Sequence, residues 1–271
     1  MNYILPVFIA LLGIFYYDTF GWLIGSWINN DYYSHGFLVP VISGYIIWSM
    51  RKELAETEKK EFQGGFMLLI AGILLKVIAI MWTIRFLSAV SLLLVISGVI
   101  LYVFGLEFMK KMRFPILFLL LMIPLPFVDT VAPPAQTISA VASSNLANLI
   151  GMPVHRDGLE LHLSTGSFEV GLACSGLNSI ISLFTIGVVF AFIIEGGLFM
   201  KSIIILLSIP LALAGNIIRI TSVLAVANIY GQEAAINYFH DFSSLLLFSV
   251  ALSGLFLAGR CFGRLRFKKI F

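Results

Sequence analysis

Apolar runs long enough to cross a lipid bilayer dominate this sequence and constrain its fold more than any other feature. Short polar breaks separate eight of them, at about 4–20, 37–50, 64–82, 86–106, 114–130, 174–194, 201–223 and 242–259. A bilayer core is crossed by about 20 apolar residues in helical form. Charged residues make up 11% of the 271 residues, against about 25% in a soluble domain. The sequence therefore predicts an all-α polytopic membrane protein with about eight transmembrane helices, and excludes a soluble globule.

Lys and Arg residues are distributed unevenly between the two sides of this arrangement. Of the 17 such residues, one side holds Arg51, Lys52, Lys59, Lys60, Lys110, Lys111, Arg113, Lys201, Arg260, Arg264, Arg266, Lys268 and Lys269. The other side holds Arg85 and Arg156, while Lys76 and Arg219 fall inside spans. Because basic residues stay on the cytoplasmic side, we expect both termini in the cytoplasm. The same asymmetry explains the net charge of +3, so nucleic acid is not an expected partner.

The longest outer segment is an insertion over residues 131–173 with two parts. Pro133 and Pro134 open the first, and apolar residues recur near helical spacing over 136–150, which favours an amphipathic helix on the membrane surface. Apolar residues then alternate strictly over 158–164 and 167–170, which predicts a β-hairpin with a turn at Thr165-Gly166. No linker or repeat divides the sequence, so we expect a single domain over residues 1–271.

Arg219 is the clearest candidate for a functional residue, because a charge retained inside a span usually faces protein or a water-filled cavity. It lies 18 residues beyond Lys201. In a helix over the predicted span 201–223, this distance places it near the outer end. Asn216, three residues earlier, lies on the same helix face and can orient the guanidinium or a bound peptide. The alternative is that Arg219 only extends to lipid headgroups.

Cys174 is predicted at the start of the sixth helix, on the same outer side as Arg219. A helix N-terminus and a nearby cation both lower the pKa of a thiol, which favours the nucleophilic thiolate. The backbone N–H groups of Ser175 or Gly176 could then stabilise an oxyanion. Taken alone, a single Cys in an apolar protein is often just a small buried side chain.

His240 lies just before the eighth helix, in an outer loop without Lys or Arg. Cys174, Arg219 and His240 thus come from three consecutive helices and meet at one membrane face. They supply a nucleophile, charge stabilisation and proton transfer, which are the parts needed for acyl transfer through a thioester. Asp241 or Glu233 could orient the imidazole, or both could be solvated loop acids.

A metal site is considered because all four His residues, at 35, 155, 162 and 240, fall on the outer side. Their spacing fits no zinc pattern. We therefore expect no metal and no other cofactor.

Four short motifs occur in one order along residues 30–245. They are Ser34-His35-Gly36 before Leu38-Val39-Pro40, the pair Pro124 and Pro126, Ala173-Cys-Ser-Gly176, and Asn216-Ile-Ile-Arg219. In these motifs the sequence resembles the exosortase/archaeosortase family. His240 matches the third catalytic position of the bacterial branch of this family. The resemblance implies that Cys174, Arg219 and His240 are catalytic, and it adds His35 as a supporting residue.

The resemblance also implies a function in the bacterial inner membrane. Substrates would be exported proteins that end in a sorting signal: a Pro-Glu-Pro type (PEP-CTERM-like) motif, a transmembrane helix and a basic cluster. A cysteine protease/transpeptidase would cleave this signal at the periplasmic face and pass the protein to an unidentified acceptor or to water. Membrane lipid would surround the enzyme.

Two other functions stay open on the residues alone. A transporter or polysaccharide-export component could use Arg219 to bind an anion, although such sites usually lie near the midplane and in repeated halves. A non-catalytic assembly protein could bind a partner through the outer hairpin, and replacement of Cys174 would then have no effect.

Overall fold

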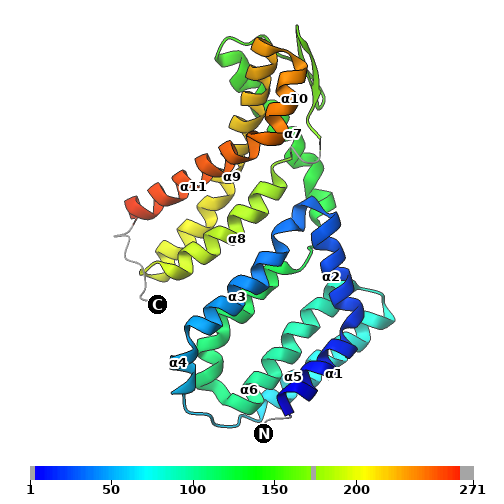
Figure 1. Cartoon of the computed structure of the whole chain (residues 1–271), viewed down its shortest axis with the longest axis vertical. Coiled ribbons are helices and arrows are strands. Elements are labelled where there is room, and N and C mark those ends of the chain that lie inside the picture. The colour runs from blue at the N-terminus through cyan, green and yellow to red at the C-terminus, as the bar shows by residue number, and fades with distance from the viewer. Residues whose placement is uncertain (1–3, 172–174, 263–271) are drawn as a thin grey trace. The chain divides into compact units, whose positions relative to one another are not determined.

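The computed structural model describes residues 4–171 and 175–262, which are mostly helical (Figure 1). These residues divide after Pro126 into two compact units, here called the N-terminal unit and the C-terminal unit. The expectation that they form one domain stays a prediction.

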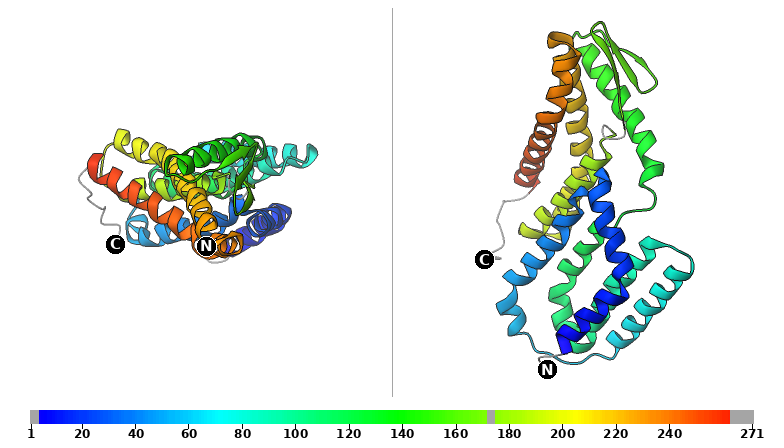
Figure 2. Two further views of the ribbon diagram at one scale, coloured as in Figure 1. Left: turned by 90° about the horizontal axis from the view of Figure 1, so that it is seen from above. Right: turned by 45° about the vertical axis from the view of Figure 1, so that its right-hand side comes forward.

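The N-terminal unit is all helical. Its elements are α1 (Ile4–Phe15), α2 (Tyr17–Asn29), the 3₁₀ helix η1 (Asp31–Phe37), α3 (Leu38–Ser49), α4 (Arg51–Ala55), α5 (Gly64–Met81), α6 (Arg85–Phe118) and the 3₁₀ helix η2 (Leu119–Met122). Helices α5 and α6 lie side by side (Figure 2, right). Small residues permit this, because a Cβ added at Gly65 would meet the backbone of Tyr102 and one at Gly98 would meet the backbone of Leu69.

Helix α6 contains a break at Gly105. This residue has φ 85° and ψ −176°, which is not helical. A side chain is disfavoured at such a φ, and a Cβ here would also meet the carbonyl oxygen of Lys60. The 34 residues of α6 therefore form two helical stretches with different directions.

Two of the predicted spans are interrupted in the structure. The run 4–20 is divided at Tyr16 between α1 and α2, and α2 continues to Asn29. The run 114–130 is interrupted after Met122, and the next helix begins at Val128. Pro124 and Pro126 explain the interruption, because proline lacks an N–H and disfavours helix in the residue before it.

The C-terminal unit combines helices with a small sheet. Its elements are α7 (Val128–Leu149), β1 (His155–Asp157), β2 (Glu160–Leu163), β3 (Gly166–Glu169), α8 (Leu177–Ile193), α9 (Leu198–Tyr230), α10 (Gln232–Asp241) and α11 (Ser243–Phe262). Leu183, Ala212 and Ala251 form the contact among α8, α9 and α11. A second cluster, with Leu161, Ile220 and Leu224, packs the sheet against α7 and α9.

The outer insertion differs in detail from its expected form. The sheet has three antiparallel strands in the order β1-β2-β3, one more than a hairpin, with Leu161 opposite Phe168. Helix α7 begins eight residues before the predicted start at 136. Its buried face carries small and polar residues such as Ser139, Ala140 and Ser143, whereas Ile138 and Leu149 are exposed. The predicted apolar stripe is therefore exposed at Ile138 and Leu149 and half-buried between them.

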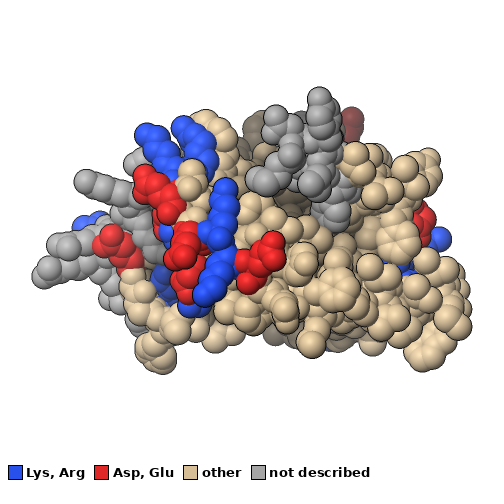
Figure 3. All heavy atoms as spheres, turned by 90° about the horizontal axis from the view of Figure 1, so that it is seen from below, with Lys and Arg blue, Asp and Glu red and all other residues tan. Residues whose placement is uncertain are grey.

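Four helical segments of the described residues are long and apolar enough to cross a membrane: Gly64–Met81, Arg85–Met122, Leu198–Tyr230 and Ser243–Arg260. Helix α8 is apolar but shorter. Charged side chains gather on part of the face seen in Figure 3. In the N-terminal unit they come from α4, residues 56–63 and the middle of α6, with ion pairs from Lys111 to Glu53 and from Lys110 to Glu107. The chain is therefore a helical protein with the character of a membrane protein.

Candidate active site

Arg219 lies within α9, a helix of 33 residues. This helix continues to Tyr230 rather than ending near 223, so Arg219 is not at its end. The Arg219 side chain is only 8% exposed, and its Nε donates a hydrogen bond of 3.1 Å to Ser243 Oγ at the start of α11. A guanidinium enclosed by protein in this way does not extend to lipid headgroups. The burial favours a function for its charge.

Asn216 lies one turn before Arg219 and is fully buried. Its Nδ2 donates to Ser139 Oγ in α7 at 3.1 Å. Ser139 Oγ in turn donates to the backbone carbonyl of Ser175 at 3.3 Å. A Cβ placed on Gly176 would lie 2.9 Å from Asn216 Nδ2, so this glycine allows the backbone to approach the amide. Asn216 and Ser139 therefore hold the chain directly after Cys174.

Helix α8 begins at Leu177, later than the predicted start at 174. The backbone N–H of Leu177 donates to Ser175 Oγ at 3.2 Å, and Gly176 has φ 75°. Since a positive φ is not helical, the helix cannot include Gly176. Cys174, predicted at the first position of this helix, lies outside the described residues.

His240 belongs to a helix and not to the loop that we expected. Gly231, with φ 88°, ends α9, and α10 then runs from Gln232 to Asp241. The sequence Gln-Glu-Ala-Ala at its start consists of good helix formers, which explains the difference. The backbone of His240 is in the last turn of α10; its side chain lies outside the described residues.

Contacts on both sides of His240 in the sequence reach the turn of α9 that carries Arg219. Tyr238, two residues earlier, donates its hydroxyl to Ser222 Oγ at 3.2 Å, and Ser222 Oγ donates to the Arg219 carbonyl at 2.7 Å. Ser243, three residues later, accepts from the Arg219 side chain. The end of α10 is therefore fixed beside Arg219, as the neighbouring helices α9, α10 and α11 also show (Figure 1).

The C-terminal unit thus brings together most of the site that the sequence predicted. Ser175, Gly176, Asn216 and Arg219 are connected through α7 and α9, and the backbone of His240 joins them through α10. The arrangement offers a buried positive charge and a close approach of backbone at Gly176. These parts suit the stabilisation of negative charge on a reacting group.

His35 lies in the other unit, in η1. It is 8% exposed, and neither ring nitrogen has a hydrogen-bond partner among the described residues. Burial lowers the pKa of the His35 imidazole below its ordinary value of 6.5, and the nearby backbone of Leu121 and Tyr32 opposes this effect in part. An imidazole in this environment is held mainly in its neutral form.

Ser139 and Ser243 contact the candidate site, and we did not predict them from the sequence. Both are fully buried, and both bond to side chains that we did predict. A signal for Ser139 exists in the sequence, because Ser139, Ser143 and Ala147 recur at a spacing of four residues, which is typical of a close helix contact. Ser243 carries no comparable signal.

Among the described residues no group of three or more His, Cys, Asp or Glu side chains could hold a metal ion. His155 and His162 pair across β1 and β2, and their rings lie 6.4 Å apart. The nearest acidic contact of His162 is Glu160, at 3.4 Å from Nε2.

The chain is similar to a known protein family. A family model described as transmembrane exosortase matches residues 27–257, which is most of the chain and includes both units. No match was found among curated proteins or solved structures. The match confirms the resemblance that the four motifs indicate.

Proposed function

The chain belongs to the transmembrane exosortase family, and we propose that it is a multi-pass membrane cysteine transpeptidase that removes C-terminal sorting signals from exported proteins. The catalytic residues are Cys174, Arg219 and His240. Asn216, Ser175 and Gly176 support them. The family resemblance adds His35, which belongs to the N-terminal unit, as a further supporting residue.

One observation carries this proposal: a single region of α9 holds both segments that would supply the reacting groups. Asn216 contacts the backbone at Gly176 and, through Ser139, the carbonyl of Ser175. Arg219 binds Ser243, which follows His240 closely in the sequence. Because Asn216 and Arg219 are one turn apart, the chain that directly follows Cys174, at 175–176, and the residues on either side of His240 contact the same turns of α9.

The chemistry follows from the residue types. The Cys174 thiolate attacks a peptide carbonyl, the resulting oxyanion is stabilised by Arg219 and a backbone N–H near Gly176, and the C–N bond then breaks. His240 donates a proton to the departing amine. The new C-terminus is held as a thioester until an acceptor amine or water, deprotonated by His240, attacks it and releases Cys174.

The membrane setting suits a substrate with a helical anchor of its own. The uneven distribution of Lys and Arg supports cytoplasmic termini, about eight crossing segments and an active site at the periplasmic face of a bacterial inner membrane. A peptide bond just outside a substrate's transmembrane helix then lies at the depth of the site. The family resemblance supports a PEP-CTERM-like signal as the recognised segment.

The test is co-expression with an exported protein that carries this signal. Wild type, Cys174→Ala and Cys261→Ala are compared, and signal loss is followed by gel shift and by mass spectrometry of the new C-terminus. Cys261, the other cysteine of the chain, is the matched control. We expect Cys174→Ala to abolish processing and Cys261→Ala to process as wild type does.

The product mass separates water from another acceptor, since transfer adds the mass of the acceptor. Equal processing by wild type and Cys174→Ala, at equal membrane levels, would refute the cysteine mechanism. Such a result would favour the transporter or the non-catalytic assembly protein.

A further inference from the structure

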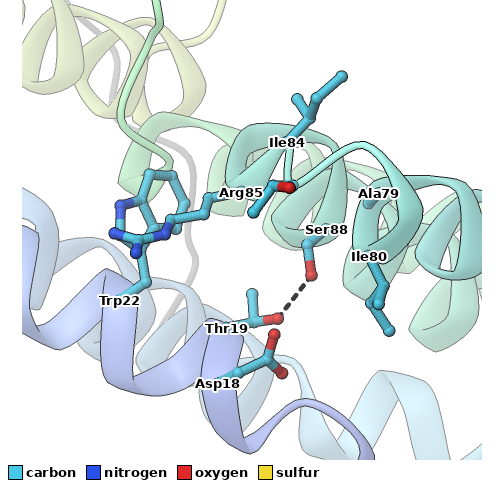
Figure 4. A pocket seen from close by; sticks show the side chains of 9 residues that line it. Asp18, Thr19, Trp22, Ala79, Ile80, Ile84, Arg85 and Ser88 are labelled. Atoms are coloured by element: carbon cyan, nitrogen blue, oxygen red, sulfur yellow. Dashed lines mark hydrogen bonds between the residues drawn. The ribbon is translucent and has the colours of Figure 1, made fainter.

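The N-terminal unit contains an open pocket of about 490 Å³ that the catalytic proposal does not use. It lies between α2 and the turn that joins α5 to α6 (Figure 4). Polar and charged residues line one part of it, namely Asp18, Thr19, Thr83, Arg85 and Ser88, and apolar ones line the rest, namely Trp22, Ala79, Ile80 and Ile84.

Asp18, which lines this pocket, is paired with a lysine that is buried beneath it. Lys76 is fully buried, and its Nζ donates to both carboxylate oxygens of Asp18, at 2.9 and 3.1 Å. The same Nζ also donates to Thr19 and Ser88, which bond to each other (Figure 4). The Asp18 side chain nevertheless remains 69% exposed. Its carboxylate has lone pairs left for a ligand, because a carboxylate accepts about four hydrogen bonds.

Arg85 provides a positive charge on the wall of the pocket. It is exposed and makes no ion pair with any residue that the structure describes. Two residues earlier, Thr83 has φ 57°, a strained conformation for a β-branched residue. Such strain is often retained at ligand sites. Asp18 and Arg85 together present one negative and one positive group to the same space.

The position of the pocket places it at a membrane surface. It lies where α5 ends at Met81 and α6 begins at Arg85, and both helices are candidate membrane spans. Ile73, Val77 and Ile80 form an exposed apolar stripe on α5 that leads to the pocket. Trp82, next to it, is 70% exposed, as is typical of aromatic residues at the interface between lipid and water.

We propose that this pocket binds the headgroup of a phosphatidylethanolamine lipid. Arg85 binds the phosphate, and Asp18 accepts hydrogen bonds from the primary ammonium, while the acyl chains lie along the stripe on α5. The ammonium carries three donors, whereas the trimethylammonium of phosphatidylcholine has none. An exposed carboxylate disfavours phosphatidylglycerol, whose headgroup is anionic and offers no cation. This proposal does not depend on the transpeptidase function.

The experiment measures lipid retention on the purified full-length protein by native mass spectrometry. The protein is titrated in detergent with phosphatidylethanolamine, phosphatidylcholine or phosphatidylglycerol of identical acyl chains. We expect phosphatidylethanolamine to bind at least about tenfold more tightly than the other two lipids, because one hydrogen bond to a charged group changes affinity by about this factor or more. Soluble phosphoethanolamine is added as competitor and should displace little, because it lacks the acyl contacts.

Arg85→Gln tests the phosphate contact, and Arg51→Gln is its control. Arg51 is also exposed, but it donates to the Trp48 carbonyl and lies away from the pocket residues. We expect Arg85→Gln to weaken phosphatidylethanolamine binding at least about tenfold and Arg51→Gln to leave it unchanged. The comparison of the three lipids tests the contact of Asp18 with the ammonium. Asp18 itself is not substituted, because its loss would leave the buried Lys76 without its ion-pair partner.

Three outcomes would overturn the proposal. Equal retention of phosphatidylethanolamine and phosphatidylcholine would exclude the ammonium contact. An equal effect of the two Arg substitutions would exclude the phosphate contact. Tighter binding of phosphatidylglycerol would instead identify a site for anionic lipid.

Discussion

Arg219 shows how one charged residue can organise a site inside an apolar helix. Its side chain binds Ser243 in α11. Its carbonyl accepts from Ser222 of the same helix, and Ser222 in turn accepts from Tyr238 in α10. Arg is suited to this because its planar group makes several directed hydrogen bonds and stays charged when buried. Lys offers the charge without the same geometry.

Replacement of Arg219 should separate charge from geometry. We expect Arg219→Gln to lower the rate of signal removal roughly 100-fold, because loss of one group that stabilises an oxyanion has about this effect. Arg219→Lys should retain part of the activity. The rate is measured by the co-expression assay at equal membrane levels, with Arg260→Gln, at the end of α11, as control. Full activity of Arg219→Gln would remove this residue from the mechanism.

The burial of His35 predicts that the free energy of unfolding depends on pH. Because burial lowers its pKa in the folded state, the unfolded state takes up a proton first as the pH falls. Stability is therefore fully present above about pH 6.5 and decreases as the pH falls from there toward the folded-state pKa. Thermal unfolding of wild type and His35→Gln, measured from pH 7.5 to pH 5, should show a steeper loss for wild type. Parallel curves would contradict this.

At the scale of elements, the start of α8 and the end of α10 position the site. The first depends on Gly176, whose φ of 75° and close contact with Asn216 both disfavour a side chain. The second depends on α10, which brings the backbone of His240 to the turn of Arg219 through Tyr238. Neither feature is a property of an isolated helix, because each is defined by contact with α9.

Gly176→Ala should impair both stability and activity. A positive φ on a residue with a side chain costs about 1–2 kcal/mol, and the added Cβ would press on Asn216. The control is Gly171→Ala, because a Cβ at Gly171 would meet nothing within 4 Å. Thermal unfolding and the co-expression assay measure the two effects. Equal stability and activity of both variants would show that the approach of Gly176 to Asn216 is not needed.

At the scale of the whole molecule, the uneven distribution of basic residues makes a prediction about orientation. Two reporter cysteines are introduced one at a time into a chain with Cys174→Ser and Cys261→Ser. Ser167→Cys lies in β3 and Glu58→Cys lies after α4; both native side chains are exposed. We expect a membrane-impermeant maleimide to label Ser167→Cys in intact spheroplasts, and Glu58→Cys only after permeabilisation. The reverse pattern would invert the proposed topology.

The sequence by itself determined the class of the protein and the identity of its main candidate residues. Apolar runs and the placement of Lys and Arg indicate a helical membrane protein, because hydrophobicity acts locally along the chain. The four motifs indicate the exosortase family, which the comparison confirms. Their positions in the sequence and the motifs also identify Cys174, Arg219 and His240 as candidate catalytic residues. Their catalytic roles stay predictions.

Only the tertiary structure decided how these local features are joined. The interruption after Met122, the end of α9 at Gly231 and the helix at His240 follow local preferences of proline, glycine and helix-forming residues that hydropathy does not register. The contacts that join these elements depend on the packing of the chain. The roles of Ser139 and Ser243 likewise arise from contacts between elements distant in sequence, 77 residues apart for Ser139 and Asn216. Hydrogen bonds of this kind form when packed helices bring their polar groups together, so a linear pattern of residue types does not contain them.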